Sequence, residues 1–277
     1  LTGLAPPASD LNHSAQGGGL KSKNLVMLLR PCFQHLPSIE RKRIEMPERV
    51  VLRLNRGERP VPLPSSIRSE IAARFHHYSF QQYPSYTPFY DKLSSHIGFS
   101  KEQICVGAGI EEFIRTLTFL CCDPGQRVAV TWPTCAMYGI YALAFGAQLI
   151  KLQTNPDAPR WDVDKLLGYL SETSPRLLFL PNPGQPVETY FSLDELKVIA
   201  DWCRERDIVL AVDEAHHGFG ASSALEWGFI PPNVLVLRTF SKFFSAASIR
   251  VGYAVGHPTL IKALHAVRPS GEISGPS

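Results

Sequence analysis

Short apolar runs alternate with amphipathic segments from about residue 102 onward. Each run has the length of a buried strand and predicts one. The predicted strands are Ile104–Val106, Val128–Trp132, Gln148–Leu152, Leu177–Leu180, Ile208–Val212, Val234–Leu237 and Val251–Val255. Apolar positions at helical spacing predict helices between the earlier strands, over Glu111–Leu120, Cys135–Phe145, Val163–Leu170 and Leu193–Arg204. Ser192, followed three residues later by Glu195, forms a capping box at the start of the last of these helices.

This alternation of strands and helices predicts an α/β domain with a mainly parallel sheet flanked by helices. In such sheets a ligand binds beyond the carboxyl ends of the strands, in the loops that follow them. We therefore expect the functional residues in those loops, within a large domain that spans residues 101–266.

The first hundred residues carry weaker patterns. Residues 1–24 are rich in Gly, Ser, Pro and Ala, and we expect residues 1–48 to form a flexible or extended N-terminal segment. The prolines within residues 60–64 and the turn-forming residues around Gln82–Tyr86 predict an N-terminal arm and connector over residues 49–100.

Composition narrows the class of protein. A hydrophobic content of 44% with 19% charged residues is typical of a globular protein with a substantial core. The net charge of +3 is too small to imply a nucleic-acid or membrane partner, and no apolar run reaches the roughly 18–20 residues that span a bilayer. The six cysteines show no CxxC or Cys/His ligand spacing, so we expect reduced thiols, no metal site and a cytoplasmic location.

The largest group of polar and reactive side chains follows the predicted strand Val234–Leu237. The segment Arg238-Thr239-Phe240-Ser241-Lys242 supplies two hydroxyls and a lysine, and Arg250 follows eight residues after the lysine. Hydroxyls and a guanidinium suit phosphate oxygens, and a lysine amine forms an imine with an aldehyde. Taken alone, the segment is more typical of a solvated basic loop.

A second polar cluster, Asp213-Glu214-Ala215-His216-His217, follows the strand Ile208–Val212. A carboxylate at the end of a buried strand is costly unless a charge pairs with it. A protonated pyridine nitrogen would supply that charge and would make a cofactor ring a better electron sink. A helix-capping acid or a metal site with the two histidines is the alternative, and metal is the weaker one because no further ligand cluster has matching spacing.

Lys242 with its neighbour Ser241, the distal Arg250 and the upstream Asp213 resembles the fold-type I enzymes that use pyridoxal 5′-phosphate. The Thr-x-Ser-Lys and Arg-x-Gly-Tyr motifs are similar to those of class I/II aminotransferases, in the histidinol-phosphate aminotransferase-like branch. The resemblance runs from about Leu52 to the end of the chain. It implies a pyridoxal-phosphate-transferase large domain, with residues 267–277 beginning a C-terminal small domain that is largely absent.

The resemblance also implies a role for each residue of these two clusters. Lys242 would hold pyridoxal phosphate as a Schiff base and move protons, and Asp213 would pair with the pyridine nitrogen. Thr239, Ser241 and Arg250 would form a cup for the phosphate.

Two further segments gain roles in the same way. Gly109, Ile110 and Glu111 resemble the turn that opens a helix onto the phosphate, where backbone N–H groups and the helix dipole favour an anion. Tyr83 resembles the tyrosine that reaches the cofactor of the neighbouring subunit, which implies a homodimer with a shared site.

Three positions depart from the family pattern. Gln185 replaces an asparagine that donates to the ring oxygen of the cofactor, and its amide can do the same from a longer arm. His216 replaces a tyrosine that contacts the same oxygen, and a histidine there resembles the oxoamine synthases. Cys135 occupies the place of the aromatic side chain that stacks on the ring, or else serves in packing alone.

The resemblance implies transfer of an amino group between an amino acid or amine and an oxo acid by a ping-pong mechanism. The partners would then be a small-molecule amino donor and an oxo-acid acceptor. The same loops also serve pyridoxal-phosphate-dependent decarboxylases and oxoamine synthase-like enzymes, and a non-catalytic homologue would retain the same fold.

Overall fold

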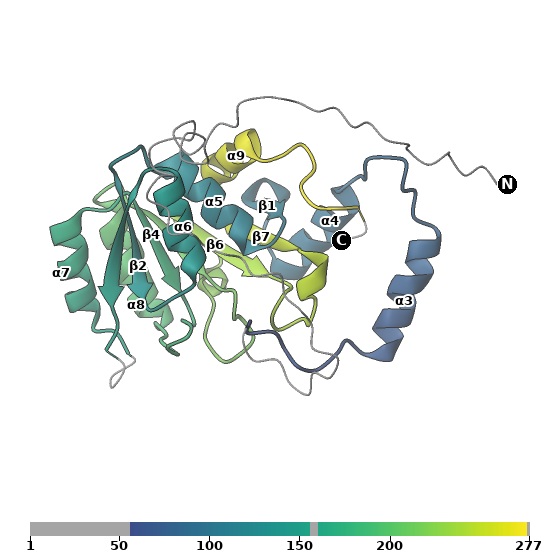
Figure 1. Ribbon diagram of the computed structural model, residues 1–277, viewed down its shortest axis with the longest axis horizontal. Helices are drawn as coiled ribbons and strands as arrows, with labels where there is room; N and C mark the ends of the chain where they lie inside the picture. The colour runs from purple at the N-terminus through teal and green to yellow at the C-terminus, as the bar shows by residue number, and fades with distance from the viewer. Residues whose placement is uncertain (1–55, 156–159, 276–277) are drawn as a thin grey trace, which may run out of the picture.

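The computed structural model describes residues 56–155 and 160–275 of the chain. The N-terminal segment expected over residues 1–48 lies outside the described residues. In the described part the strands form one seven-stranded sheet, in the order β1-β7-β6-β5-β4-β2-β3 (Figure 1). The strands are β1 (Ile104–Gly107), β2 (Arg127–Trp132), β3 (Gln148–Gln153), β4 (Leu177–Pro181), β5 (Val209–Asp213), β6 (Val234–Thr239) and β7 (Gly252–Gly256). All seven predicted strands are therefore confirmed.

The four predicted helices are confirmed as α5 (Ile110–Cys121), α6 (Ala136–Ala144), α7 (Val163–Thr173) and α8 (Leu193–Arg204). The described residues contain three further helices, namely α3 (Ser65–His76), α4 (Thr87–Ile97) and α9 (Pro258–Val267). Two of them lie in the segment expected to be a connector. There Pro64 is the N-cap of α3, and α4 has a proline in its first turn. These prolines begin helices because a proline at a helix start gives up no intrahelical hydrogen bond.

The direction of β7 decides which chain segments meet. Strands β2 through β6 pair in parallel, whereas β7 runs antiparallel to both β6 and β1. The prediction of a mainly parallel sheet is confirmed, with β7 as the exception. Because β7 is reversed, its amino end lies at the same edge of the sheet as the carboxyl ends of the other strands.

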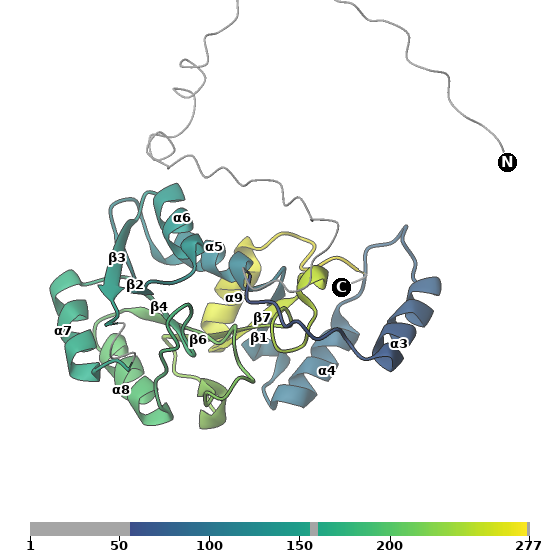
Figure 2. The same cartoon turned by 60° about the horizontal axis from the view of Figure 1, so that its bottom comes forward.

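Helices cover both faces of the sheet, as the alternation of side chains along β4 shows. Leu177 and Phe179 pack in one apolar cluster with residues of α5, α6 and α9, whereas Leu178 and Leu180 pack in the other with residues of α4, α7 and α8. In Figure 2, α5 and α6 lie above the sheet and α7 and α8 below it. This double cover explains why the strands are continuous apolar runs. Among the described residues no helix is long and apolar enough to cross a bilayer.

The capping box predicted at Ser192 is present. The Ser192 hydroxyl accepts from the backbone N–H of Glu195 at 3.2 Å, and the Glu195 carboxylate accepts from the N–H of Ser192 at 2.8 Å. These bonds satisfy donors that the first turn of a helix otherwise leaves free.

We expect Ser192→Ala to lower the free energy of unfolding by about 1 kcal/mol, because the first turn of α8 loses its acceptor. Urea denaturation followed by circular dichroism measures this loss. Ser171→Ala, at an exposed position of α7, is the matched control and should change stability far less. Equal losses in the two variants would contradict the capping role.

Candidate active site

One edge of the sheet gathers almost all the residues singled out from the sequence. The turn with Gly109 follows β1, Cys135 follows β2, and Gln185 follows β4. The remaining predicted residues lie at or after the ends of β5 and β6, or directly before β7, namely Asp213, His216, Thr239, Ser241, Lys242 and Arg250. Tyr83 is the exception, because it lies between α3 and α4 and its side chain is 97% exposed.

Asp213 is buried at the end of β5 and is held by two neutral donors. The Tyr138 hydroxyl donates to its Oδ2 at 2.5 Å, and the Ala215 N–H donates to its Oδ1 at 2.8 Å. Burial raises the pKa of the Asp213 carboxyl, while the two hydrogen bonds and the charge of Lys242 act in the opposite direction. A cationic group placed beside this carboxylate would stabilise its ionised form.

The Tyr138 contact was not predicted from the sequence. Its ring packs against Phe179 within the core, and the residue is only 2% exposed. In the sequence it lies inside an apolar helical segment and is indistinguishable from a packing residue. Burial and the nearby Asp213 charge hold the pKa of the Tyr138 hydroxyl well above its usual range, so the hydroxyl stays a donor.

An anion cradle forms where the turn before α5 meets the start of β7. A Cβ on Gly252 would stand 2.8 Å from the backbone of Gly109, and one on Gly109 would stand 2.9 Å from the Arg250 Nη2. Gly109 also has φ +84°, which disfavours a side chain. The two glycines therefore let the N-terminus of α5 approach the guanidinium, an arrangement that favours a phosphate.

Thr239 and Ser241 are joined by a hydrogen bond between their hydroxyls at 2.9 Å. The Ser241 N–H also donates to the Thr239 Oγ1 at 3.1 Å, so the chain turns sharply before Lys242. The two hydroxyls and the Arg250 guanidinium belong to one excursion of the chain between β6 and β7. The donor set expected around a phosphate is thus present on neighbouring segments.

The Lys242 amine lies among the other polar groups of this edge. Burial lowers its pKa, and the charges of Glu58, Cys135 and Asp213 act in the opposite direction. Burial, together with the positive charge of Lys242, lowers the pKa of His216 to about 4. Asp213, Cys135 and His216 are thus each within electrostatic reach of the Lys242 amine.

A strap formed by residues 56–61 crosses the lysine loop, a contact that no pattern in the sequence predicts. The Lys242 Nζ donates to the Arg56 carbonyl oxygen at 2.5 Å, and the Arg59 Nη1 donates to the Phe243 carbonyl oxygen at 2.9 Å. A Cβ on Gly57 would stand 3.1 Å from the Gln185 Nε2 and 3.4 Å from the Lys242 Nζ. The Gln185 amide and the Lys242 amine thus both lie close to Gly57 of the strap.

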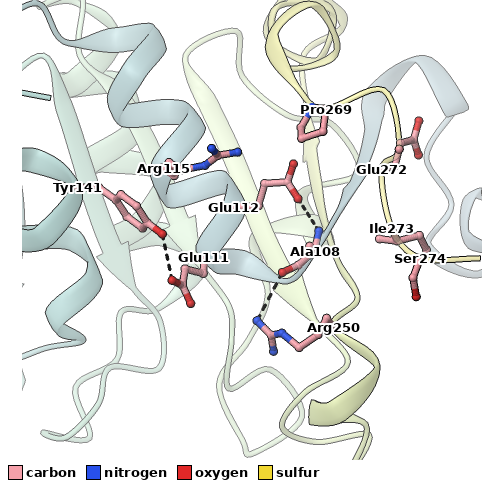
Figure 3. A pocket seen from close by; sticks show the side chains of 11 residues that line it. Ala108, Glu111, Glu112, Arg115, Tyr141, Arg250, Pro269, Glu272, Ile273 and Ser274 are labelled. Carbon is pink, nitrogen blue, oxygen red and sulfur yellow. Dashed lines mark hydrogen bonds between the residues drawn. The ribbon is translucent and has the colours of Figure 1, made fainter. Parts of the chain in front are cut away.

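Glu111 lines a neighbouring cavity, in which its side chain lies beside that of Tyr141 (Figure 3). The cavity measures about 400 Å3 and lies between α5, the Arg250 side chain and the segment 269–274. The Glu111 carboxylate accepts from the Tyr141 hydroxyl at 3.0 Å there. Ile110, the first residue of α5, is buried in the core, so any contribution of these two residues to anion binding comes from the helix backbone.

The two remaining departures from the family pattern are placed as follows. Cys135 is the N-cap of α6 and is exposed in this structure, and partial desolvation by the surrounding protein is the main cause of the raised pKa of its thiol. The ring of His216 lies 6.3 Å from that of Phe219. In the described ranges, no group of three or more His, Cys, Asp or Glu side chains is arranged to hold a metal ion.

Glu214, directly after Asp213, is buried and paired with a cation. Its Oε2 accepts from the Arg238 Nε at 2.8 Å, and its Oε1 accepts from the Ala224 N–H at 2.7 Å. From the sequence, the segment that begins with Arg238 could also have been a solvated basic loop. The Arg238 side chain instead forms the ion pair with Glu214, and only 13% of it is exposed.

Residues 49–277 match the family model described as Aminotransferase class I and II. The chain belongs to the class I and II aminotransferases. Among curated relatives it is 26% identical over 242 residues to a histidinol-phosphate aminotransferase of Pelodictyon phaeoclathratiforme, covering 86% of this chain and 66% of that protein. It is 30% identical over 253 residues to that of Desulfitobacterium hafniense, covering 88% and 67%. The expected resemblance to this branch is confirmed, and the chain spans about two thirds of the length of these relatives.

Solved structures agree on the fold. A histidinol-phosphate aminotransferase from Sinorhizobium meliloti, in complex with pyridoxal-5′-phosphate, superimposes with a TM-score of 0.78 at 22% identity, covering 90% of this chain and 68% of that one. An aspartate aminotransferase from Thermus thermophilus superimposes with a TM-score of 0.67 at 20% identity, covering 76% and 61%. The expected large-domain fold of this family is therefore confirmed.

We expect Tyr138→Phe to lower the free energy of unfolding by about 1–3 kcal/mol, because the buried Oδ2 of Asp213 loses its donor. Chemical denaturation at neutral pH measures the change. Tyr141→Phe removes a hydroxyl from a more exposed bond to Glu111 and is the matched control, with a smaller expected loss. A loss for Tyr138→Phe no larger than that of the control would contradict the account of Asp213.

We expect His216 to stay neutral at pH 7 in the cofactor-free chain and to gain its proton only near pH 4, because its surroundings disfavour the imidazolium. Histidine 15N chemical shifts measured against pH test this. Lys242→Met should raise the pKa of His216 by removing a positive charge, whereas Lys262→Met, on α9, should leave it unchanged. A His216 pKa at its ordinary value of 6.5 would contradict the placement.

Proposed function

We propose that this chain carries the cofactor-binding half of a pyridoxal-phosphate-dependent aminotransferase. The observation that carries the proposal is the meeting of a lysine amine, a buried carboxylate and an anion cradle at one edge of the sheet. Each of the three supplies a different attachment for the same cofactor. The solved relative in complex with pyridoxal-5′-phosphate supports the assignment.

The residues present fit this cofactor chemically. The N-terminus of α5 with Thr239, Ser241 and Arg250 would hold the phosphate, since these groups offer hydrogen-bond donors and positive charge. Asp213 would hold the proton on the pyridine nitrogen, which gives its buried carboxylate the cationic neighbour it lacks among its two hydrogen-bond donors. Gln185 and His216 would bind the ring oxygen, and Cys135 would lie against the ring.

Bound pyridoxal phosphate supplies an aldehyde that captures an amino group and a ring that withdraws electrons from the adjacent carbon. Lys242 would hold the aldehyde carbon in the resting enzyme. Once the amino donor has displaced it, the Lys242 amine would act as general base and move the proton at the substrate α-carbon. The lowered pKa of Lys242 suits this role, because an amine must be neutral to accept a proton.

We propose amino transfer from an amino acid or amine to an oxo acid in a ping-pong sequence. Several curated relatives are named histidinol-phosphate aminotransferases, and another, from Corynebacterium efficiens, an aromatic amino acid aminotransferase. These names support the transfer reaction for the present chain.

We also propose a homodimer in which Tyr83 of one copy completes the phosphate cup of the other. The nearly full exposure of Tyr83 supports this arrangement, because the side chain is available to a second copy. The cytoplasmic location stays a prediction from the cysteine pattern.

The test of the lysine assignment is cofactor attachment. Pyridoxal phosphate added to the chain should produce a visible absorption band, and borohydride reduction followed by peptide mass spectrometry should place the label on Lys242. Lys242→Ala should lose both signals and all amino transfer. Lys262→Ala, which replaces an exposed lysine of α9, should retain them.

Three results would count against the proposal. A band that survives Lys242→Ala would refute the lysine assignment, and the absence of any band would favour a non-catalytic homologue. A panel of amino donors, assayed for oxo acid and for carbon dioxide, separates transfer from decarboxylation. Carbon dioxide as the main product would refute the aminotransferase assignment.

A further inference from the structure

Glu214 and Arg238 form a pair that adjoins the proposed site, since they are the chain neighbours of Asp213 and Thr239. Glu214 is 1% exposed, and its Oε2 lies 2.8 Å from the Arg238 Nε. The Ser223 hydroxyl bridges the two side chains, since it donates to the Glu214 Oε2 at 2.7 Å and accepts from the Arg238 Nη2 at 2.6 Å. The carboxylate also accepts from the Ala224 N–H, so its oxygens are well satisfied.

The other groups around Arg238 complete its surroundings. Its Nη2 lies 3.3 Å from the His217 Nδ1, and its Nη1 lies 3.5 Å from the Tyr253 hydroxyl. Strand β7 and the loops after β5 therefore all contact this one guanidinium. A side chain fixed from so many directions has little freedom to move.

Each member of the pair is the chain neighbour of a proposed cofactor-binding residue. Glu214 follows Asp213, and Arg238 precedes Thr239. The Glu214 N–H donates to the Leu237 carbonyl oxygen at 2.8 Å, and Asp213 is in register with Leu237. The ion pair thus ties the last residues of β5 to those of β6 at the point where both chains enter the site.

Such a pair is a poor source of overall stability, because taking two charges out of water costs about as much as their attraction returns. Its value lies in the geometry that it enforces. Removal of one partner leaves the other charge buried and uncompensated, so the surrounding segments must rearrange. Here those segments carry Asp213 on one side and Thr239, Ser241 and Lys242 on the other.

We propose that Glu214 and Arg238 are positioning residues that hold the acid of β5 and the hydroxyl-lysine loop of β6 at the separation that pyridoxal phosphate requires. The identity of the cofactor in this inference rests on the proposed function, whereas the geometry of the ion pair comes from the structure. Neither residue touches the cofactor in this account. Their effect passes through Asp213 and Thr239.

The test compares Glu214→Gln, which keeps the shape of the side chain and removes its charge, with the wild-type chain. Two quantities are measured: the dissociation constant of pyridoxal phosphate from the absorption band, and the hydrogen-exchange rates of two backbone amides in the cofactor-free chain. The amides are those of Ala215, which binds Asp213, and Ser241, which binds Thr239.

We expect Glu214→Gln to weaken cofactor binding by about tenfold or more and to speed exchange at both amides. Arg238→Lys keeps the charge without the planar fork and should restore part of the affinity relative to Arg238→Met. If Glu214→Gln fails to fold, Ser223→Ala removes only the bridging hydroxyl and should show the same changes to a smaller degree.

Glu272→Gln is the matched control. Its carboxylate is 5% exposed and pairs with Arg268 at 2.5 Å, and neither residue adjoins Asp213 or Thr239 in the chain. This variant should unfold more easily yet keep the affinity for pyridoxal phosphate and both amide rates. Equal weakening in the control, or wild-type values in the Glu214 and Ser223 variants, would overturn the positioning role.

The two measurements also separate this inference from the proposed function. A wild-type chain that binds no pyridoxal phosphate refutes the function, while the amide rates still decide whether the pair holds the two segments. Normal binding in the wild-type chain with unchanged amide rates in Glu214→Gln refutes the positioning role alone.

Discussion

Two adjacent carboxylates at the end of β5 experience opposite electrostatic constraints, and the organisation of the site follows from that difference. Glu214 is buried against the Arg238 guanidinium, whereas Asp213 is buried against a tyrosine hydroxyl and a backbone N–H. Burial disfavours the ionised form of both. Glu214 is compensated within the protein and acts as an anchor. Asp213 has only neutral donors, so it is the one with capacity left for a cationic ligand.

The sheet and its covering helices could be predicted because the length and spacing of apolar runs are visible in short stretches of the sequence. Runs such as Leu177–Leu180 are apolar throughout, since one pair of side chains faces each helical layer. The candidate residues Asp213, Lys242 and Arg250 were also recognisable, because each follows or precedes a predicted strand at the edge where ligands bind. Their assignment to a cofactor came from family resemblance, and the pattern of strands alone did not supply it.

Contacts between distant segments could not be predicted in this way. Tyr138 has the sequence environment of a core residue, and only the packing of α6 against β4 brings its hydroxyl to Asp213. Arg238 has the sequence environment of a basic loop, and only the parallel pairing of β5 with β6 brings it to Glu214. The hydrogen bond from Lys242 to Arg56 joins residues that lie 186 positions apart in the sequence. In each case a polar group is satisfied by a partner that no local spacing reveals.

The antiparallel direction of β7 determines how the residues of the site are divided among chain segments. Thr239 and Gly252 face each other across the β6–β7 pair, so the segment between them is an excursion closed at its base. The pairing of β6 with β7 already brings the two ends of this segment together. The entropy cost of closing the loop is therefore met by the strand pair. The hydroxyls, Lys242 and Arg250 therefore enter the site together on one segment whose two ends are fixed by the same strand pair. The acid and the glycine turn enter separately, since they arrive on β5 and β1.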